Sequence, residues 1–119
     1  MARILIAEDD ETMRRFLTSA LTRAGHAVDS VADGLAAEVA VRQNHYDVLI
    51  ADIVMPGIDG IELVRRANAL KPRLRAMFIT GFAAVALKAR EFGPRDARIL
   101  SKPFHLRELV AEIDRMLAA

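Results

Sequence analysis

Residues 48–52 read VLIAD, four apolar residues in a row followed by an aspartate. A strand with one face in water alternates apolar and polar residues, whereas an uninterrupted apolar run is typical of a strand covered on both faces. Such strands occur in sheets that carry helices on either side. This segment therefore indicates an α/β domain, and its aspartate lies where the buried strand ends.

Four further short apolar runs alternate with longer segments of helical pattern. Strands and helices that alternate along a chain are typical of α/β domains with a parallel sheet. We therefore expect five parallel strands, each followed by a helix. The expected strands are Ile4–Ala7, Ala27–Ala32, Asp47–Asp52, Ala76–Thr80 and Arg98–Ser101.

Helical periodicity is clearest near the two ends of the chain. Between Met13 and Ala24, apolar residues recur at spacings of three and four, and Gly25 supplies a left-handed stop. A similar stripe runs through residues 106–117. The sequence DGIE at 59–62 resembles a capping box, which predicts the start of a third helix that ends before Pro72.

The helix expected between Phe82 and Phe92 has the weakest pattern. Val85, Ala89 and Phe92 share a face that we expect to point inward, whereas Leu87 points away from it. Gly93 and Pro94 close the helix. Leu87 and the neighbouring Ala83-Ala84 fit either a partner surface or a small satellite core, and the satellite core is the simpler interpretation.

Composition limits what the chain can be. Its 119 residues, without an internal linker, predict one domain over residues 1–119 and no effector domain. There is no cysteine, so the chain has no disulfide framework and no thiolate chemistry. The net charge is only +1, and basic pairs such as Arg14-Arg15 are best explained as solvated helix faces rather than as a nucleic-acid site. The apolar stretch after Arg3 is too short for a signal peptide or a membrane span, so we expect a cytoplasmic protein.

Polar residues follow the expected strands. In open parallel sheets, ligands bind beyond the carboxyl ends of the strands, where the strand order reverses. The residues at those ends are three acids after the first strand, an acid ending the third, a hydroxyl ending the fourth and an amine after the fifth: Glu8, Asp9, Asp10, Asp52, Thr80 and Lys102.

Carboxylates held close together either become protonated or bind a cation, because their mutual repulsion penalises the charged forms. Oxygen ligands beside flexible loops suit Mg²⁺, which accepts one or two carboxylates plus a phosphate oxygen. Lys102 would add a positive charge for a phosphoryl group, and Thr80 a hydrogen bond. A carboxylate in such a site can attack phosphorus and become an acyl phosphate, so the chemistry indicates phosphoryl transfer.

Four motifs, EDD at 8–10, DIVMPGIDG at 52–60, FITG at 78–81 and SKPF at 101–104, resemble the receiver domain of bacterial response regulators in order and spacing. The resemblance covers essentially the whole chain. It implies a flavodoxin-like, doubly wound (βα)5 fold with a five-stranded parallel sheet in the order 2-1-3-4-5. It also implies a signalling protein of a two-component system or phosphorelay.

The same resemblance assigns roles to single residues. Asp52 resembles the phosphoacceptor. Asp9 would bind Mg²⁺ or Mn²⁺ directly and Glu8 through a metal-bound water, with Asp52 and the backbone carbonyl of Val54 as further ligands. The resemblance implies that three residues bind the phosphoryl group and switch with it, namely Thr80, Gly81 and Lys102. It also implies a cis peptide bond between Lys102 and Pro103.

The implied partners are a histidine kinase or histidine phosphotransfer protein and a downstream protein partner. Such a protein catalyses its own phosphotransfer and autodephosphorylation and acts on no free substrate. We expect a monomer or weak homodimer, with no nucleic-acid or membrane partner.

A finer resemblance rests on the strings DIVMPGIDGIELVRRA, MFITGFAAVAL, LSKPFHLRELV and MLAA. They are similar to stand-alone receivers of alphaproteobacteria that serve as phosphorylation-controlled adaptors for the ClpXP protease, active when unphosphorylated. The ending Leu117-Ala118-Ala119 resembles a degradation tag, and an alanine-rich helix end explains it equally well.

The chain departs from the receiver pattern in two places. Ile99 stands where many receivers carry a Tyr or Phe, so output is expected through the helix at 82–92, with Phe82, Ala83, Leu87 and Ile99 as the candidate partner surface. Val54 and Phe82, at the rim of the expected site, are apolar and unable to orient water, which predicts slow autodephosphorylation.

Two of the acids near the first strand have simpler roles than metal binding. Asp10 is expected to cap the first helix and Glu11 to suit its first turn. A metal-dependent phosphatase of the haloacid dehalogenase type needs a second aspartate where Val54 stands, and no glycine-rich loop indicates a flavodoxin-like nucleotide-binding enzyme. A vestigial interaction module is disfavoured by the retained acid, hydroxyl and amine at the strand ends.

Overall fold

A computed structural model describes residues 1–118 of the chain. Within these residues, strands and helices alternate five times, and all strands are parallel in the order β2-β1-β3-β4-β5. The predicted flavodoxin-like architecture is therefore confirmed. The elements are β1 (Arg3–Ala7), α1 (Glu11–Arg23), β2 (Ala27–Val31), α2 (Gly34–Gln43), β3 (Val48–Asp52), α3 (Gly60–Leu70), β4 (Arg75–Thr80), α4 (Ala83–Phe92), β5 (Arg98–Ser101) and α5 (Leu106–Ala118).

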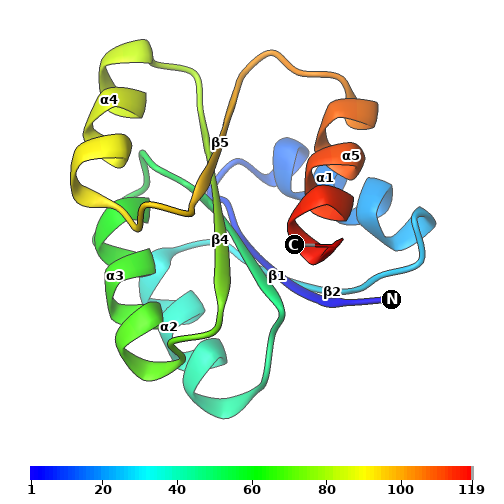
Figure 1. Ribbon diagram of the computed structural model, residues 1–119, viewed down its shortest axis with the longest axis horizontal. Coiled ribbons are helices and arrows are strands. Elements are labelled where there is room, and N and C mark those ends of the chain that lie inside the picture. Colours follow the sequence, from blue (N-terminus) through cyan, green and yellow to red (C-terminus); the bar gives the residue numbers. More distant parts are fainter. Residues whose placement is uncertain (119) are drawn as a thin grey trace.

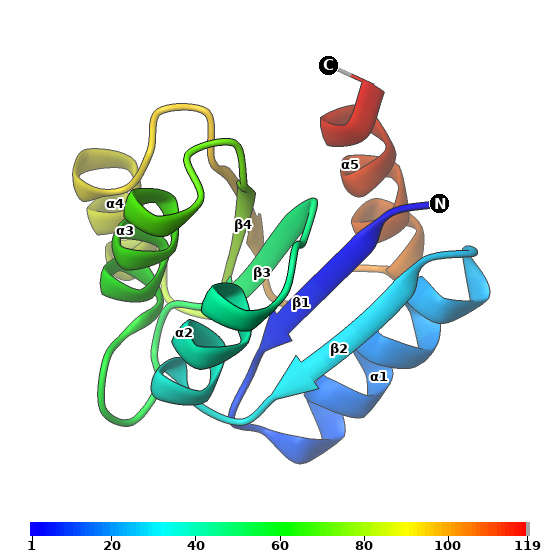
Figure 2. The same ribbon diagram turned by 90° about the horizontal axis from the view of Figure 1, so that it is seen from below.

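The sheet lies between two layers of helices (Figures 1 and 2). Helices α1 and α5 cover one face, and α2, α3 and α4 cover the other. Successive residues of a strand point to opposite faces, so Ile4 and Ile6 pack with α1 and α5, whereas Leu5 packs with α2 and α3. Each face therefore has its own apolar core.

All five residues of β3 are buried, as its uninterrupted apolar run predicts. The strand lies between β1 and β4. Ala7 of β1 is level with Ala51 of β3, so the residues that follow both strands emerge side by side at one edge of the sheet. This register positions the site described below.

Polar caps fix where the helices begin and end. The Asp10 carboxylate accepts hydrogen bonds from the backbone N–H groups of Thr12 and Met13, and Gly25, with φ of 95°, follows the end of α1. At α3, Asp59 accepts from the N–H of Glu62, which is one half of the predicted capping box. The Glu62 side chain instead contacts Arg66 of its own helix. None of the helices described is both long and apolar enough to cross a bilayer.

Helix α4 differs from its predicted orientation. Ala89 is buried and Val85 half-buried, but Phe92 is 62% exposed rather than inward. The residue after the helix, Gly93, lies close to the ring of Phe78, because a Cβ there would lie only 2.9 Å from that ring. Leu87 is also 62% exposed, so the satellite core expected around it and Ala83 is wrong.

Candidate functional site

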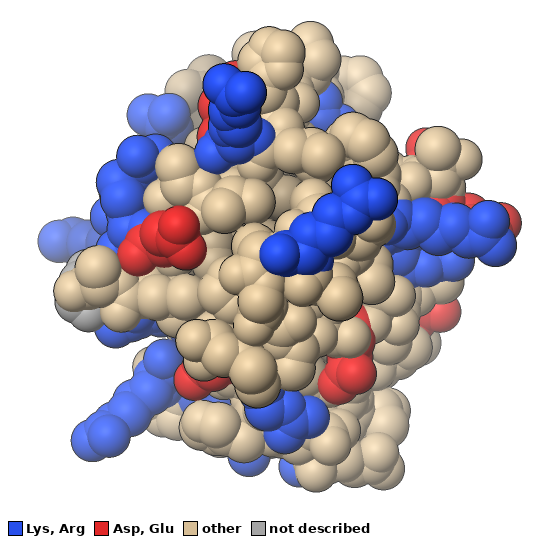
Figure 3. All heavy atoms as spheres, turned by 90° about the vertical axis from the view of Figure 1, so that its right-hand side faces the viewer, with Lys and Arg blue, Asp and Glu red and all other residues tan. Residues whose placement is uncertain are grey.

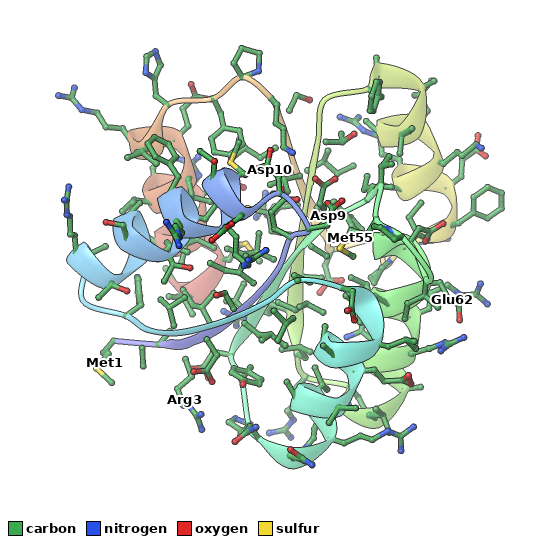
Figure 4. The ribbon with its side chains drawn as sticks, turned by 180° about the vertical axis from the view of Figure 1, so that it is seen from behind. Met1, Arg3, Asp9, Asp10, Met55 and Glu62 are labelled. Atoms are coloured by element: carbon green, nitrogen blue, oxygen red, sulfur yellow. The ribbon has the colours of Figure 1, made fainter. Side chains whose placement is uncertain are left out.

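Three carboxylates meet at the edge of the sheet where β1 and β3 end. Glu8 and Asp9 follow β1, and Asp52 is the last residue of β3. Each offers an oxygen that lies within 4.8 Å of the others. Figure 4 labels Asp9 after β1 and Met55 in the loop after β3, whereas Met1 and Arg3 lie at the opposite end of β1.

Glu8 is fully buried. Burial raises the pKa of its carboxyl group to about 7, the nearby Asp52 carboxylate acts in the same direction, and a hydrogen bond from the N–H of Asp10 opposes the rise. The ionised form of Glu8 therefore needs a positive charge nearby to stabilise it. This is the electrostatic condition in which a carboxylate cluster takes up a cation.

Lys102 supplies one such charge. Its Nζ donates to Asp52 Oδ2 at 2.9 Å and to Glu8 Oε1 at 3.2 Å. Burial alone would lower the pKa of this lysine, but the hydrogen bonds and negative charges of Asp52 and Glu8 raise it overall. The residue directly follows β5, its N–H donates to the carbonyl of Thr80, and the Lys102–Pro103 peptide bond is cis.

Asp52 is nearly buried, with 7% of its surface exposed. Oδ2 accepts from Lys102, and Oδ1 accepts from the backbone N–H of Val54 at 3.1 Å. Gly60 allows the start of α3 to approach this strand end, because a Cβ there would collide with the Asp52 carbonyl and lie 2.9 Å from Ile53 Cα. The glycine of the IDG sequence thus keeps Asp52 and the following loop in place.

Thr80 does not contact the carboxylates. Its buried hydroxyl accepts from the N–H of Phe82 at 3.1 Å and lies 3.5 Å from the Phe82 carbonyl. Within residues 1–118, no hydrogen bond joins this hydroxyl to Asp52 or Lys102. The exposed Gly81 connects Thr80 to the start of α4.

The rim of the site is apolar. The side chains of Val54 and Phe82 are 50% and 61% exposed. The predicted partner surface is only partly a surface, because Phe82, Ala83 and Leu87 are exposed whereas Ile99 is half-buried against the core beneath α2, α3 and α4. Ile99 therefore belongs to the packing behind the surface.

Two other acids have the structural roles predicted for them. Asp10 caps α1, and Glu11 forms an ion pair of 2.7 Å with Arg15 one turn later. In Figure 4, Asp10 lies at the start of α1, beyond Asp9. Neither residue belongs to the cluster of potential metal ligands among the residues described.

Arg14 was not predicted as a site residue. Expected on a solvated helix face, it is half-buried, and its guanidinium donates to the backbone carbonyl of Glu8 at 2.9 Å. The bond holds the end of β1 against α1. The sequence gives no signal for this contact, because Arg14 reads there as one of an ordinary pair of surface arginines. The contact becomes visible only once the fold places the Glu8–Asp9 loop against α1.

The donor set fits a hard divalent cation. Three carboxylates with oxygens within 4.8 Å, one of them exposed at Asp9, match the oxygen ligands that Mg²⁺ prefers. Beside them, the ammonium of Lys102 can pair with a negatively charged group, and the carboxylate of Asp52 can act as a nucleophile. The arrangement can therefore hold a phosphoryl group between a carboxylate and an ammonium.

Comparisons with known proteins agree with this geometry. Residues 4–114 match the model of the family described as the response regulator receiver domain. The response regulator receiver protein CpdR of Brucella abortus is 56% identical, over all of this chain and 99% of its own length. A response regulator receiver protein from Sinorhizobium medicae is 30% identical with a TM-score of 0.92, over 98% of this chain and 94% of its own. The response regulator TrrA of Thermotoga maritima, solved in complex with Mg²⁺-BeF, is 26% identical with a TM-score of 0.87, over 98% and 99%.

Proposed function

Because the chain belongs to the response regulator receiver domain family, we propose that it is a signalling switch set by phosphorylation of Asp52. A histidine kinase or histidine phosphotransfer protein would be the donor. The observation that carries the proposal is the contact of Lys102 with both Asp52 and Glu8 at the carboxyl edge of the sheet. This contact brings together a nucleophile (Asp52), a positive charge (Lys102) and a potential metal ligand (Glu8).

The transfer step follows from these groups. An oxygen of Asp52 attacks the phosphorus of the phosphohistidine, the new O–P bond forms, and the P–N bond breaks with its electron pair going to the imidazole. Lys102 then moves its hydrogen bonds from the carboxylate toward the phosphoryl oxygens. Because Asp52 is nearly buried, these contacts form in a low-dielectric setting where charge pairing is strong.

Glu8, Asp9 and Asp52, with the carbonyl of Val54, are proposed to hold Mg²⁺ or Mn²⁺, which would neutralise charge on the phosphoryl oxygens when bound. TrrA, which has the same fold, was solved with Mg²⁺-BeF. The chain's own contribution is to orient the ligands. The N–H of Asp10 fixes Glu8 Oε2, and Arg14 fixes the Glu8 carbonyl.

Thr80 and Gly81 are proposed to transmit the change to α4. A Thr80 hydroxyl that turns to a phosphoryl oxygen gives up its bond with the N–H of Phe82. Phe82 is the N-cap residue of α4, and no side chain makes a capping hydrogen bond to this helix. The start of α4 therefore changes its hydrogen bonding when Asp52 is modified, and the exposed Phe82, Ala83 and Leu87 move with it.

The output is proposed to be contact with a partner protein. We propose that the receiver domain acts in the cytoplasm, as a monomer or weak homodimer. The strings quoted above, together with 56% identity to CpdR, support a phosphorylation-controlled adaptor for the ClpXP protease that is active when unphosphorylated. The possible degradation tag at residues 117–119 lies partly outside the described residues. The protein would catalyse only its own phosphotransfer and dephosphorylation.

One experiment tests the switch. The protein is incubated with Mg²⁺ and acetyl phosphate, and its mass is followed for wild type, Asp52→Ala and the control Asp10→Asn. The proposal requires a phosphoryl adduct on wild type and Asp10→Asn that is absent from Asp52→Ala. Turnover of phosphate esters would support a phosphatase instead, and no adduct on any variant would support a vestigial site.

A second experiment tests the adaptor role. Immobilised ClpXP is incubated with wild type and with Asp52→Ala, which mimics the unphosphorylated state. Capture of both proteins, with loss of wild type after acetyl phosphate treatment, is expected. Failure of both to bind would remove the adaptor role and leave the switch untouched.

A further inference from the structure

Helix α2 begins against the loop that follows Asp52. This loop, here called the β3–α3 loop, comprises residues 53–59, and α2 lies beside α3 in one layer of helices (Figures 1 and 2). The first residue of α2, Gly34, is buried. A Cβ there would collide with Ile58 Cγ1 and lie 2.9 Å from the Ile58 carbonyl oxygen. The start of α2 and the β3–α3 loop are therefore in close contact because residue 34 has no side chain.

Both sides of this contact are held in place. Asp33, the N-cap residue of α2, accepts a hydrogen bond of 2.8 Å from the N–H of Ala36, which fixes where the helix begins. Ile58 is half-buried and packs against the core beneath α2, α3 and α4. Since a main-chain atom of Ile58 faces Gly34, rotation of the isoleucine side chain alone would not make room for a methyl group. The loop itself would have to move.

The β3–α3 loop links this contact to the phosphorylation site. At its start, the N–H of Val54 donates to Asp52 Oδ1 at 3.1 Å, and the carbonyl of Val54 is the proposed metal ligand. At its end, the N–H of Gly60 donates to the carbonyl of Ile53 at 2.8 Å, which closes the base of the loop. A short loop closed at its base transmits a displacement from one side to the other. The position of Ile58 therefore affects the position of Val54.

From this arrangement we propose that Gly34 is a positioning residue for the metal and phosphoryl site. It has no side chain with which to bind the cation, and it acts through Ile58 by letting the β3–α3 loop lie where Val54 serves Asp52 and the metal. The alternative is a glycine needed only for tight packing, whose replacement costs stability and nothing else. The inference rests on the proposed function in one respect, namely that Mg²⁺ binds beside Asp52.

Two glycines with similar surroundings distinguish these alternatives. In Gly34→Ala the new methyl group meets Ile58, whereas in the matched control Gly93→Ala it would lie 2.6 Å from the Ala89 carbonyl and 2.9 Å from the ring of Phe78. The control glycine follows the C-terminal end of α4, and the site borders the other end of that helix. Stability is measured by urea denaturation. Mg²⁺ affinity is measured from amide shifts in NMR spectra, without a phosphoryl donor.

Both variants are expected to lose stability, but only Gly34→Ala is expected to bind Mg²⁺ more weakly. A loss of about tenfold is typical when a group that orients a metal ligand is disturbed. Adding Ile58→Ala removes the colliding side-chain atoms and should restore part of the affinity, while the Ile58 carbonyl keeps the restoration incomplete. Val110→Ala, added to Gly34→Ala instead, is the control and should restore nothing. Val110 is half-buried on α5, in the layer that faces the viewer in Figure 3.

Wild-type Mg²⁺ affinity in Gly34→Ala would identify a packing glycine and overturn the proposal. A Gly34→Ala/Ile58→Ala variant that binds Mg²⁺ no better than Gly34→Ala would overturn it as well. Should Gly34→Ala not fold, the double variant is compared with Ile58→Ala, because only the double variant keeps the clash with the carbonyl. Weaker Mg²⁺ binding by the double variant then supports the proposal, and equal binding overturns it.

Failure of the proposed function has a different signature. Without any Mg²⁺-dependent amide shifts in wild type, the metal site itself would be refuted, and the role of Gly34 with it. If wild type, Gly93→Ala and Gly34→Ala all show the same Mg²⁺-dependent shifts at the same affinity, the metal site stands and only the positioning role of Gly34 is refuted.

Discussion

The ammonium of Lys102 donates a 2.9 Å hydrogen bond to the carboxylate of Asp52, and the two residues are 50 positions apart in the chain. The same ammonium reaches the buried Glu8. One lysine after β5 therefore offsets the repulsion between acids after β1 and at the end of β3. The stability of the site and its chemistry depend on the same charge.

Removing the positive charge of Lys102 should destabilise the fold, and bound Mg²⁺ should restore part of the lost stability. In Lys102→Gln, Glu8 and Asp52 face each other without compensation, and we expect a loss of about 1–3 kcal/mol in the free energy of unfolding. Urea denaturation with and without Mg²⁺ measures it, with Arg107→Gln as a control. An equal loss at saturating Mg²⁺ would contradict the shared role of lysine and cation.

The two acids after Glu8 should differ in function. Asp9→Asn removes an exposed oxygen of the carboxylate cluster and is expected to cripple Mg²⁺-dependent phosphorylation by acetyl phosphate. Asp10→Asn keeps a side-chain oxygen for the cap of α1 and should leave phosphorylation nearly intact. The adduct is quantified by mass spectrometry, and identical behaviour of the two variants would disprove the assignment.

Gly60→Ala should disturb Asp52 from behind. The new methyl group would collide with the Asp52 carbonyl and lie 2.9 Å from Ile53 Cα, both of them backbone atoms. We expect thermal or chemical unfolding to show a loss of about 1–3 kcal/mol. Gly81→Ala is the control, because nothing lies within 4 Å of a Cβ there. Similar stability of both variants would show that the close approach is unimportant.

Tyr46 allows a test of the electrostatics at the other end of the sheet. It is the only tyrosine, it donates a 2.6 Å hydrogen bond to Asp29, and burial together with that carboxylate raises its pKa to about 12. Since the raised pKa favours the neutral phenol, this stabilisation is complete below the ordinary pKa of about 10 and is lost as pH rises through 12. Absorbance titration should give that high midpoint, and Asp29→Asn should lower it. An unshifted midpoint in wild type would refute the contact.

The apolar rim should make the phosphorylated state long-lived. Val54 and Phe82 are exposed, and neither side chain offers a group that orients an attacking water. We expect slow loss of the phosphoryl group from wild type and faster loss from Val54→Asn, followed by mass after removal of the donor. Rapid loss from wild type would overturn this expectation.

Much of the site follows from the sequence because parallel strands end at a common edge. Glu8, Asp9, Asp52 and Lys102 each come directly after or at the end of an apolar run, so their meeting could be predicted without coordinates. The cap at Asp10 was equally readable, since it depends only on residues within one turn.

Features that depend on packing could not be predicted. Phe92 follows the inward spacing of α4 but is exposed, and the buried Phe78 of β4 lies instead against Gly93, the next residue. Arg14 reads as a surface residue until the end of β1 is placed against it. Arg90 of α4, Arg95 of the following loop and Arg98 of β5 line one hollow, which only the fold creates.

A free carboxylate has two equivalent oxygens, and the backbone around Asp52 removes that symmetry. Oδ1 accepts a hydrogen bond from the backbone N–H of Val54, whereas Oδ2 accepts one from a side chain, the ammonium of Lys102. The two oxygens are therefore distinct nucleophiles before any donor arrives. In the phosphorylation proposed for Asp52, the turn after β3 therefore decides which carboxylate oxygen is free to meet the donor.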